Sequence, residues 1–173
     1  MIEAVEGGWW YATFLANRRL AVNFYSDPDF MPRRLGTRLD LWQQMVGETR
    51  FISRWIESAG YQISDPPRIA SAGTVWLENA AGPDWLAVGD AAVSFDPLSA
   101  HGMTTALWTG NEAAEAVALA LTGHGAALDS YAARLRLGVE QYDRERRQIY
   151  AREIRFTHHP FWQRRQKPID HRA

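Results

Sequence analysis

The sequence predicts an α+β fold, and three observations predict it. Strand-forming aromatic and apolar residues crowd the first 25 positions, and apolar residues then recur at helical spacing. Two long helical patterns occupy most of the chain after residue 102. The chain has 173 residues, of which 46% are hydrophobic, so it can build the core of one ordinary domain.

The chain opens with a predicted β-hairpin. Residues 7–15 and 20–25 are rich in strand formers, and the polar residues 16–19 between them favour a turn. Because Trp9, Trp10 and Tyr11 do not alternate with polar residues, we expect both faces of the hairpin to be covered.

A helical pattern follows over about 38–59. Thr37 is a predicted N-cap, and Asp40 is placed to favour the start of a helix. Gly47 leaves two alternatives open, one helix or two joined near that glycine, and Gly60 is the predicted C-terminal stop.

A crossover segment comes next. Asp65, Pro66 and Pro67 end any helix, and residues 68–73 and 74–77 are predicted strand segments. Residues 79–84 form a predicted turn.

The stretch from Trp85 to Met103, which we call the Gly-Asp stretch, carries the chemistry. Its first part is a predicted strand that ends at Gly89 and Asp90. Glycine lets the backbone approach a ligand closely, and the adjacent carboxylate can accept hydrogen bonds from ligand hydroxyls. A loop containing Pro97 then leads to Gly102, where a helix start would direct free N–H groups at an electron-rich ligand edge.

The Gly-Asp stretch resembles the second FAD-binding motif of the flavin-dependent monooxygenase superfamily, and is most similar to its tryptophan halogenase-like and geranylgeranyl reductase-like branches. The resemblance implies that the aspartate holds a ribityl hydroxyl of FAD, that the loop lies against the isoalloxazine, and that the helix start faces the pyrimidine edge of the ring. It also places the aromatic hairpin in a substrate-domain sheet near the pocket, although simple packing under helices explains those rings equally well. The implied cofactor-binding residues are Gly89, Asp90, Pro97, Leu98, Ser99, Gly102 and Met103.

Two predicted helices complete the chain. The first is rich in alanine, runs to about residue 122 and stops at Gly123, and the second is capped by Asp129 or Ser130 and runs to about 153. Phe161 and Trp162 belong to a basic tail, and they dock either on a partner or on this chain.

No catalytic residue is assigned. His101 lies in the loop that faces the flavin in the resembling family, so it is either a proton donor near the ring or a polar loop residue without a catalytic task. No metal site is predicted, because His158 and His159 lack carboxylate or cysteine partners nearby in the sequence and the chain has no cysteine.

The strand, Gly-x-Gly-x-x-Gly turn and helix that would cradle the FAD pyrophosphate are absent from this sequence. The resemblance therefore covers the C-terminal part of such a protein, without its N-terminal Rossmann part. We expect the strand ending at Gly89 to pair with strands that this chain lacks, supplied by an N-terminal FAD-domain partner chain or by self-association. A halogenase-type Trp-x-Trp-x-Ile-Pro signature is also absent, which disfavours halogenation.

These observations give a predicted organisation and function. Residues 1–78 form the substrate-domain sheet and helix, 79–125 the C-terminal segment of the FAD-binding domain, and 126–173 the C-terminal helix and basic tail. The chain is interpreted as the FAD-binding and substrate-binding portion of a flavin-dependent oxidoreductase or monooxygenase, a fragment or one half of a two-part protein. The alternative is a non-enzymatic assembly module that binds a protein through the aromatic hairpin and the basic C-terminal helix.

Charge and hydropathy limit the partners. The net charge is −1, and no stretch approaches the roughly 18 apolar residues that span a bilayer, so neither nucleic acid nor membrane is expected as a partner. The expected substrate is a small molecule. An aromatic substrate is one option, since eight tryptophans are available to line a pocket for a flat ligand. The absence of cysteine and of a signal-peptide pattern fits a cytoplasmic location.

Overall fold

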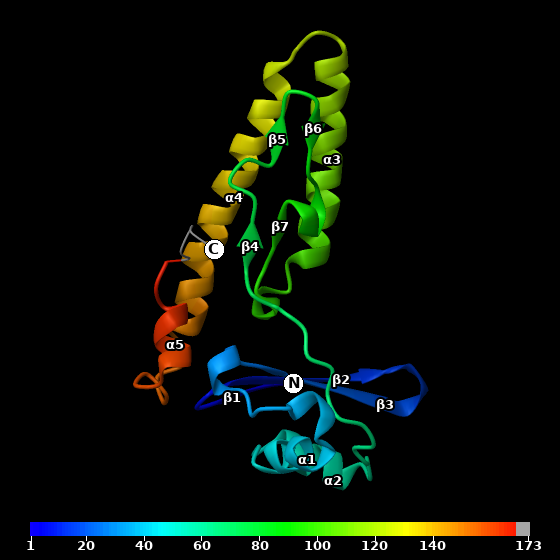
Figure 1. Cartoon of the computed structure of the whole chain (residues 1–173), viewed down its shortest axis with the longest axis vertical. Helices are drawn as coiled ribbons and strands as arrows, with labels where there is room; N and C mark the ends of the chain where they lie inside the picture. The colour runs from blue at the N-terminus through cyan, green and yellow to red at the C-terminus, as the bar shows by residue number, and fades with distance from the viewer. Residues whose placement is uncertain (169–173) are drawn as a thin grey trace. The chain divides into compact units, whose positions relative to one another are not determined.

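The computed structural model describes residues 1–168, apart from the side chain of Asn17, and divides the chain into two compact units. Unit 1 comprises Met1–Ala70 and Tyr150–Gln166, and unit 2 comprises Ser71–Ile149 with Lys167 and Pro168. Helices and small antiparallel sheets make up both units, so the predicted α+β class is confirmed (Figure 1). The units are defined by packing, and they do not test which stretch serves a flavin and which a substrate.

The predicted hairpin is the centre of the sheet in unit 1. Strands β2 (Gly8–Leu15) and β3 (Arg19–Tyr25) pair antiparallel, with Trp10 opposite Phe24. A third strand, β1 (Ile2–Val5), joins the other edge of β2 and was not predicted. The two tryptophans at the start of β2 are almost completely buried, which agrees with the expectation that both faces are covered.

Two short helices cover this sheet, α1 (Leu39–Gly47) and α2 (Ile52–Ser58). Of the two alternatives, the chain has two helices that separate at Gly47, and Gly60 follows the second with a positive φ, as predicted. The predicted cap at Thr37 is wrong, since Arg38 occupies the N-cap and the Thr37 hydroxyl donates to the carbonyl of Arg34 instead. Trp42, Val46, Ile52 and Ile56 pack with Trp10 in the core of unit 1.

The start of α2 is held by a buried carboxylate from the sheet. Glu3 on β1 is 7% exposed, and its two carboxylate oxygens accept hydrogen bonds from the backbone N–H groups of Arg50, Phe51 and Ile52. Those N–H groups lack helical partners, so a side chain distant in sequence satisfies the helix start. A capping residue 47 positions away leaves no local sequence signal.

The basic tail docks on its own chain. Helix α5 (Pro160–Arg165) buries Phe161 and Trp162, and the Trp162 indole N–H donates to the carbonyl of Val5 at 3.1 Å. Arg165 pairs with Asp27 at 2.8 Å within the same unit. Of the two alternatives for these aromatic residues, docking within the chain is confirmed.

Unit 2 contains two small sheets and two long helices (Figure 1). Each sheet is an antiparallel pair: β4 (Val75–Trp76) pairs with β7 (Val93–Ser94), and β5 (Ala81–Gly82) pairs with β6 (Trp85–Leu86). The two helices, α3 (Gly102–Leu121) and α4 (Ala126–Tyr150), were both predicted, with somewhat different bounds. Gly123 follows α3 with a positive φ, as predicted. The predicted cap at Asp129 or Ser130 is wrong, because α4 begins at Ala126 and both residues lie within its first turns; the helix ends about three residues earlier than predicted.

Two predictions for the strands of unit 2 are wrong. Residues 68–73 form no strand, and the segment 74–77 is a strand only at Val75–Trp76. The predicted strand up to Gly89 spans only Trp85–Leu86, and it pairs with β5 along one edge. The expected pairing with strands of another part stays a prediction. The turn at 82–85 closes this local hairpin, and its two-residue strands are too short to show a periodic pattern.

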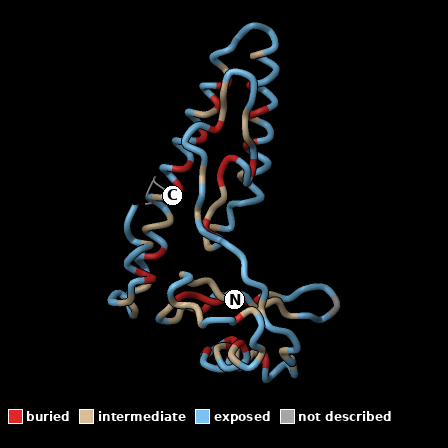
Figure 2. The backbone as a smooth tube through the Cα atoms, viewed as in Figure 1, coloured by how far each residue is buried: buried red, intermediate tan, exposed pale blue. Residues whose placement is uncertain are grey.

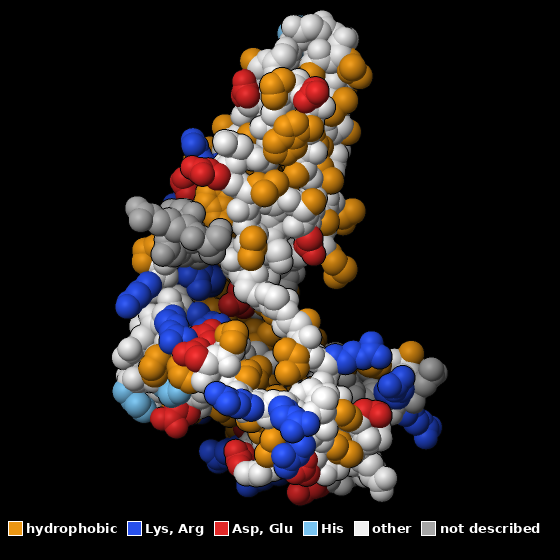
Figure 3. Space-filling model, viewed as in Figure 1, with side chains coloured by type: hydrophobic (Ala, Val, Ile, Leu, Met, Phe, Trp, Pro, Cys, Tyr) orange, Lys and Arg blue, Asp and Glu red, His pale blue; other side chains and the backbone are white. Residues whose placement is uncertain are grey.

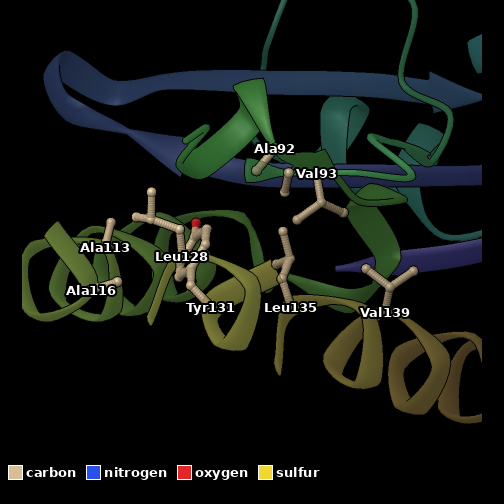
Figure 4. Packing of buried hydrophobic residues seen from close by; sticks show 9 residues of the cluster. Ala92, Val93, Ala113, Ala116, Leu128, Tyr131, Leu135 and Val139 are labelled. Atoms are coloured by element: carbon tan, nitrogen blue, oxygen red, sulfur yellow. The ribbon is translucent and has the colours of Figure 1, made fainter. Parts of the chain in front are cut away.

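The core of unit 2 lies between the helices and the small sheets. Tyr131, Leu135 and Val139 recur every four residues on α4, and they face Ala113 of α3 and Val93 of β7 (Figures 2 and 4). Because α3 contributes small side chains, its backbone lies close to its neighbours.

None of the helices in residues 1–168 combines the length and apolar character needed to cross a membrane. Over the same residues, no group of three or more histidine, aspartate or glutamate side chains could hold a metal ion.

Candidate functional site

The Gly-Asp stretch folds as strand, turn, strand, turn and helix within unit 2. After β6, residues Gly89–Ala91 form a 3-10 turn, β7 follows, Pro97–Ser99 form a second 3-10 turn, and α3 begins at Gly102. The predicted order of strand, loop and helix is therefore observed, but the strand is shorter and the loop is divided by β7.

Gly89 is pressed against α3. Its φ is +56°, and a Cβ at this position would lie 3.4 Å from the Cβ of Ala106. Its N–H donates to the hydroxyl of Thr109 at 2.9 Å, and that fully buried hydroxyl donates in turn to the carbonyl of Thr105 at 2.8 Å. Glycine is therefore favoured by the backbone conformation, while an added Cβ would make an ordinary contact with the helix.

Asp90 lies on the surface directly after this contact. Its side chain is exposed, and no hydrogen bond or ion pair joins its carboxylate to another side chain within residues 1–168. A carboxylate without a protein partner keeps its acceptor capacity for ligand hydroxyls.

The second turn is shaped by Asp96. Its Oδ1 accepts a hydrogen bond from the N–H of Leu98 at 3.0 Å, and its carbonyl accepts one from the hydroxyl of Ser99 at 2.9 Å. Ala100 closes the turn with a φ of +54°. Such hydrogen bonds within the turn hold Pro97, Leu98 and Ser99 in one conformation without help from the neighbouring strand or helix.

Two tyrosines of α4 form hydrogen bonds with the backbone of the Gly-Asp stretch. The Tyr131 hydroxyl donates to the carbonyl of Ala87 at 2.6 Å, and the Tyr142 hydroxyl accepts from the N–H of Asp96 at 3.0 Å. The hydroxyl of Thr74 accepts from the same N–H and also bonds Tyr142. Because 11 residues are about three helical turns, both tyrosines face the same side of α4.

Burial raises the pKa of both tyrosines. For Tyr142 the main cause is burial, to which the nearby Asp96 carboxylate adds. For Tyr131 burial again comes first, followed by the charge of Glu112. No role in the candidate site was predicted for either tyrosine. Their anchoring role depends on partners 44 and 46 residues away, so no local signal revealed it.

The start of α3 is open. His101 occupies the N-cap without a side-chain capping bond, Gly102 is exposed, and the side chain of Met103 is 84% exposed. The first N–H groups of a helix have no partner within the helix and carry the positive end of its dipole. Since Gly89 packs on Ala106 in the next turn, this helix start and Asp90 belong to the same part of unit 2.

A cavity of about 180 Å³ lies beside the loop, within unit 2. Its walls include the aromatic rings of Phe95, Trp108 and Tyr142. His101 and Glu145 line it as well, which gives it a polar part. Of the predicted site residues, His101 is the one that takes part in both the loop and the cavity.

Comparisons with known proteins agree with a flavoprotein. No family model matches the chain. It is 28% identical, over 165 residues, to a protein of Marinomonas mediterranea named "Putative FAD-dependent oxidoreductase LodB", and the match covers 95% of this chain and 43% of the relative.

One solved structure has the same fold over nearly the whole chain. It is QhpG, described as a peptidyl tryptophan dihydroxylase essential for tryptophylquinone cofactor biogenesis. The two share 23% sequence identity with a TM-score of 0.72, over 99% of this chain and 40% of that chain. This chain therefore spans less than half the length of either protein, and it is similar to one part of an FAD-dependent oxidoreductase by sequence and to one part of QhpG by fold.

Proposed function

We propose that this chain is the FAD-binding and substrate-binding portion of a flavin-dependent oxidoreductase. One observation carries the proposal: the exposed carboxylate of Asp90, which has no side-chain partner within residues 1–168, follows a glycine with positive φ, and this glycine packs on α3 one turn from the open start of that helix. A hydroxyl acceptor and a set of free N–H groups are then available together, as a flavin's ribityl chain and ring require.

The residues present fit this cofactor. Asp90 would hold a ribityl hydroxyl, the turn at Pro97, Leu98 and Ser99 would lie along the ring, and the N–H groups at Gly102 and Met103 would face the ring's pyrimidine edge. FAD supplies the redox chemistry when bound. The chain's own contribution is to orient the ring through a turn fixed by Asp96 and to stabilise negative charge at the helix start.

We propose that the substrate carries an aromatic ring. The specific candidate is the indole of a tryptophan within a peptide. The cavity beside the loop supports this, because its aromatic walls suit a flat ring and Glu145 offers an acceptor for a ring N–H. QhpG, which has a matching fold, is a peptidyl tryptophan dihydroxylase by name, and this supports a peptide-borne tryptophan as the substrate and hydroxylation as the reaction. His101 lines the cavity, which keeps it as the candidate proton donor.

The alternative, an assembly module, has less support. It relies on the aromatic residues of the hairpin and on the basic C-terminal helix, but Trp9, Trp10, Phe161 and Trp162 are all buried within unit 1. These four side chains are not available to a partner, and Phe14 at the end of the hairpin, which is 61% exposed, is the aromatic residue that remains for that alternative.

A flavin titration tests the proposal. We expect the chain alone to bind FAD more weakly than about 1 µM, since it lacks a pyrophosphate cradle. The variant Asp90→Ala loses charged hydrogen bonds to the ligand that are worth about 1.5–3 kcal/mol, so we expect it to bind FAD roughly 10- to 100-fold more weakly. Asp84→Ala, another exposed aspartate of unit 2, is the matched control and should bind normally. Equal affinities for the two variants would refute the assigned site, and submicromolar binding by the chain alone would contradict the missing cradle.

A further inference from the structure

Gly138 lies in the middle of α4, where glycine is unfavourable. It is the only glycine among the 25 residues of this helix. A glycine in a helix interior costs stability relative to alanine, because the unfolded chain has more conformational freedom at glycine and no side chain packs in the folded chain. Its presence in α4 therefore calls for another explanation.

Neither of the usual structural explanations for a glycine applies to Gly138. Its backbone is helical, so it needs no positive φ, in contrast to Gly89 and Gly123. Within residues 1–168, and apart from its chain neighbours and the backbone of its own helix, no heavy atom lies within 4 Å of a Cβ added at this position. Gly138 therefore leaves open space, and it is not needed for the close approach of a neighbouring element.

This open space belongs to the cavity beside the loop. Leu135, Gly138 and Tyr142 are separated by three and four residues, so they form one row along α4. All three line the cavity. A side chain at position 138 would project between the side chains of its two neighbours in this row, and it would occupy part of the cavity.

Aromatic rings and the first turns of α3 form the other walls. His101 at the start of α3 and Trp108, about two turns further along that helix, line the cavity. Phe95 lines it as well, and the centroid of its ring lies 4.0 Å from that of Tyr142. At Gly138, by contrast, the cavity meets the backbone of α4, because this residue has no side chain.

A carboxylate lies in the same row of α4. Glu145 follows Tyr142 by three residues and lines the cavity. Its Oε1 accepts a hydrogen bond from Nε2 of Gln141 at 2.9 Å, which draws the carboxylate back along the helix toward Gly138. Its Oε2 makes no hydrogen bond within residues 1–168, so it is available to accept one from a ligand N–H.

The composition of these walls favours a neutral aromatic ring as the ligand. Small-molecule pockets are mainly apolar, with a few polar groups that fix the orientation of the ligand. This cavity combines the rings of Phe95, Trp108 and Tyr142 with the acceptor of Glu145. Hydrophobic side chains also recur over the face of unit 2 that Figure 3 shows. An indole, which is flat and carries one N–H, matches both the apolar walls and the single acceptor.

The volume of the cavity makes position 138 decisive. A cavity of about 150 Å³ accommodates benzene. The cavity beside the loop has a volume of about 180 Å³, so one ring fits and a second, fused ring has little space to spare. Even one methyl group at position 138 would remove part of that space, whereas glycine leaves all of it.

We propose that Gly138 determines the size of the ring that the cavity admits, and that it makes room for the two fused rings of an indole. The face of the indole lies over the α4 backbone at this glycine, and Glu145 accepts a hydrogen bond from the ring N–H. This inference rests on the proposed function, which identifies a tryptophan within a peptide as the substrate.

Ring binding by the full chain, measured without FAD, tests the proposal. The probes are N-acetyltryptophanamide, which carries two fused rings, and N-acetylphenylalaninamide, which carries one ring. NMR titration of the isotopically labelled chain gives both affinities. In Gly138→Ala we expect at least about tenfold weaker binding of the tryptophan probe and less than about a twofold change for the phenylalanine probe.

Gly110→Ala is the matched control. It replaces a glycine inside α3 that also has nothing within 4 Å of an added Cβ, and this glycine does not line the cavity. We expect Gly110→Ala to bind both probes as the native chain does. Both variants should melt at or above the native temperature, because alanine is the better helix former. A lower melting temperature for Gly138→Ala alone would show that its Cβ meets another group, which would overturn the proposal.

The remaining outcomes separate this inference from the flavin site. Equal binding of the tryptophan probe by the native chain and Gly138→Ala, or no binding by the native chain, would overturn the proposal. An equal loss of both probes in Gly138→Ala would also overturn it, because the glycine would then not select by ring size. If Gly138→Ala loses only the tryptophan probe while Asp90→Ala and the native chain bind FAD equally, the flavin site fails and the role of Gly138 stands.

Discussion

At the scale of single residues, the candidate site is held by hydroxyl groups. Thr109 fixes Gly89, and Tyr142 with Thr74 fixes Asp96, so the backbone on both sides of β7 is fastened to its surroundings. Asp90 is the contrast, since its side chain is left without a protein partner between two fastened points. This distribution is expected where a scaffold must present one polar group to a ligand in a fixed position.

Gly89→Ala tests whether the backbone conformation is required. We expect a loss of about 1–2 kcal/mol in the free energy of unfolding, because a Cβ disfavours the positive φ of Gly89. Gly110→Ala is the control, since nothing lies within 4 Å of its added Cβ and helical alanine is favoured over glycine by about 0.5–1 kcal/mol. Urea unfolding followed by circular dichroism gives both values, and a Gly89→Ala variant as stable as the native chain would contradict the preference for glycine in this conformation.

Tyr142→Phe tests the fastening of the loop. Removing the hydroxyl takes one acceptor from the Asp96 N–H, and Thr74 remains as the other, so we expect a moderate loss of about 1 kcal/mol. Tyr11→Phe in unit 1 provides the comparison. If the two substitutions change the unfolding midpoint equally, the Tyr142 hydroxyl does not hold the loop.

The same tyrosine predicts a dependence on alkaline pH. Burial raises the pKa of Tyr142 above its usual 10.0, so the neutral hydroxyl is favoured in the folded chain. Its contribution to stability is fully present below pH 10 and is lost as the pH rises through the raised pKa. Because burial raises the pKa of Tyr131 as well, absorbance at 295 nm should show two tyrosines that ionise late, and Tyr142→Phe should remove one of them; a variant that loses a tyrosine ionising near pH 10 instead would disprove the shift.

At the scale of elements, helices α1 to α4 and the hairpin of β2 and β3 were predicted, whereas α5 and most of the short strands were not. The patterns around Trp42 and Leu135 mark helices because many residues share one periodicity, and Gly60 and Gly123 end them where expected. Strands of two residues have no periodicity to detect, which explains the errors at 68–77 and at Trp85–Leu86. Thr37 misled the prediction of the first helix, because N-cap propensity is local while the chain there turns through Arg34 and Arg38.

Glu3→Ala tests how the sheet supports α2. Three backbone N–H groups lose their charged acceptor in this variant, so we expect a loss of about 2–3 kcal/mol. Glu3→Gln retains only one acceptor oxygen and should lose less. Glu57→Ala, which removes an exposed carboxylate of α2 itself, should change stability by no more than about 0.5 kcal/mol. Thermal melts rank the three variants, and a Glu3→Ala variant as stable as Glu57→Ala would show that α2 does not depend on this cap.

At the scale of the whole molecule, the sequence identified the Gly-Asp stretch but could not show how it is held. The residues from Gly89 to Met103 carried the flavin prediction because their order resembles a known FAD-binding motif. Tyr131 and Tyr142 were missed as anchors since their partners lie far away along the chain. The exposure of Met103, Leu107 and Leu121 on α3 was also not predicted, because small and apolar residues in a helix do not reveal which side is covered.

The most direct test of the flavin site is an NMR titration of the isotopically labelled full chain with FAD. The account predicts that the amide resonances of Gly89, Asp90, Gly102 and Met103 shift progressively, while those of α2 remain in place, and that Asp90→Ala removes these shifts. Shifts confined to other parts of the chain, or equal shifts in Asp90→Ala, would contradict the claim that this stretch holds the flavin.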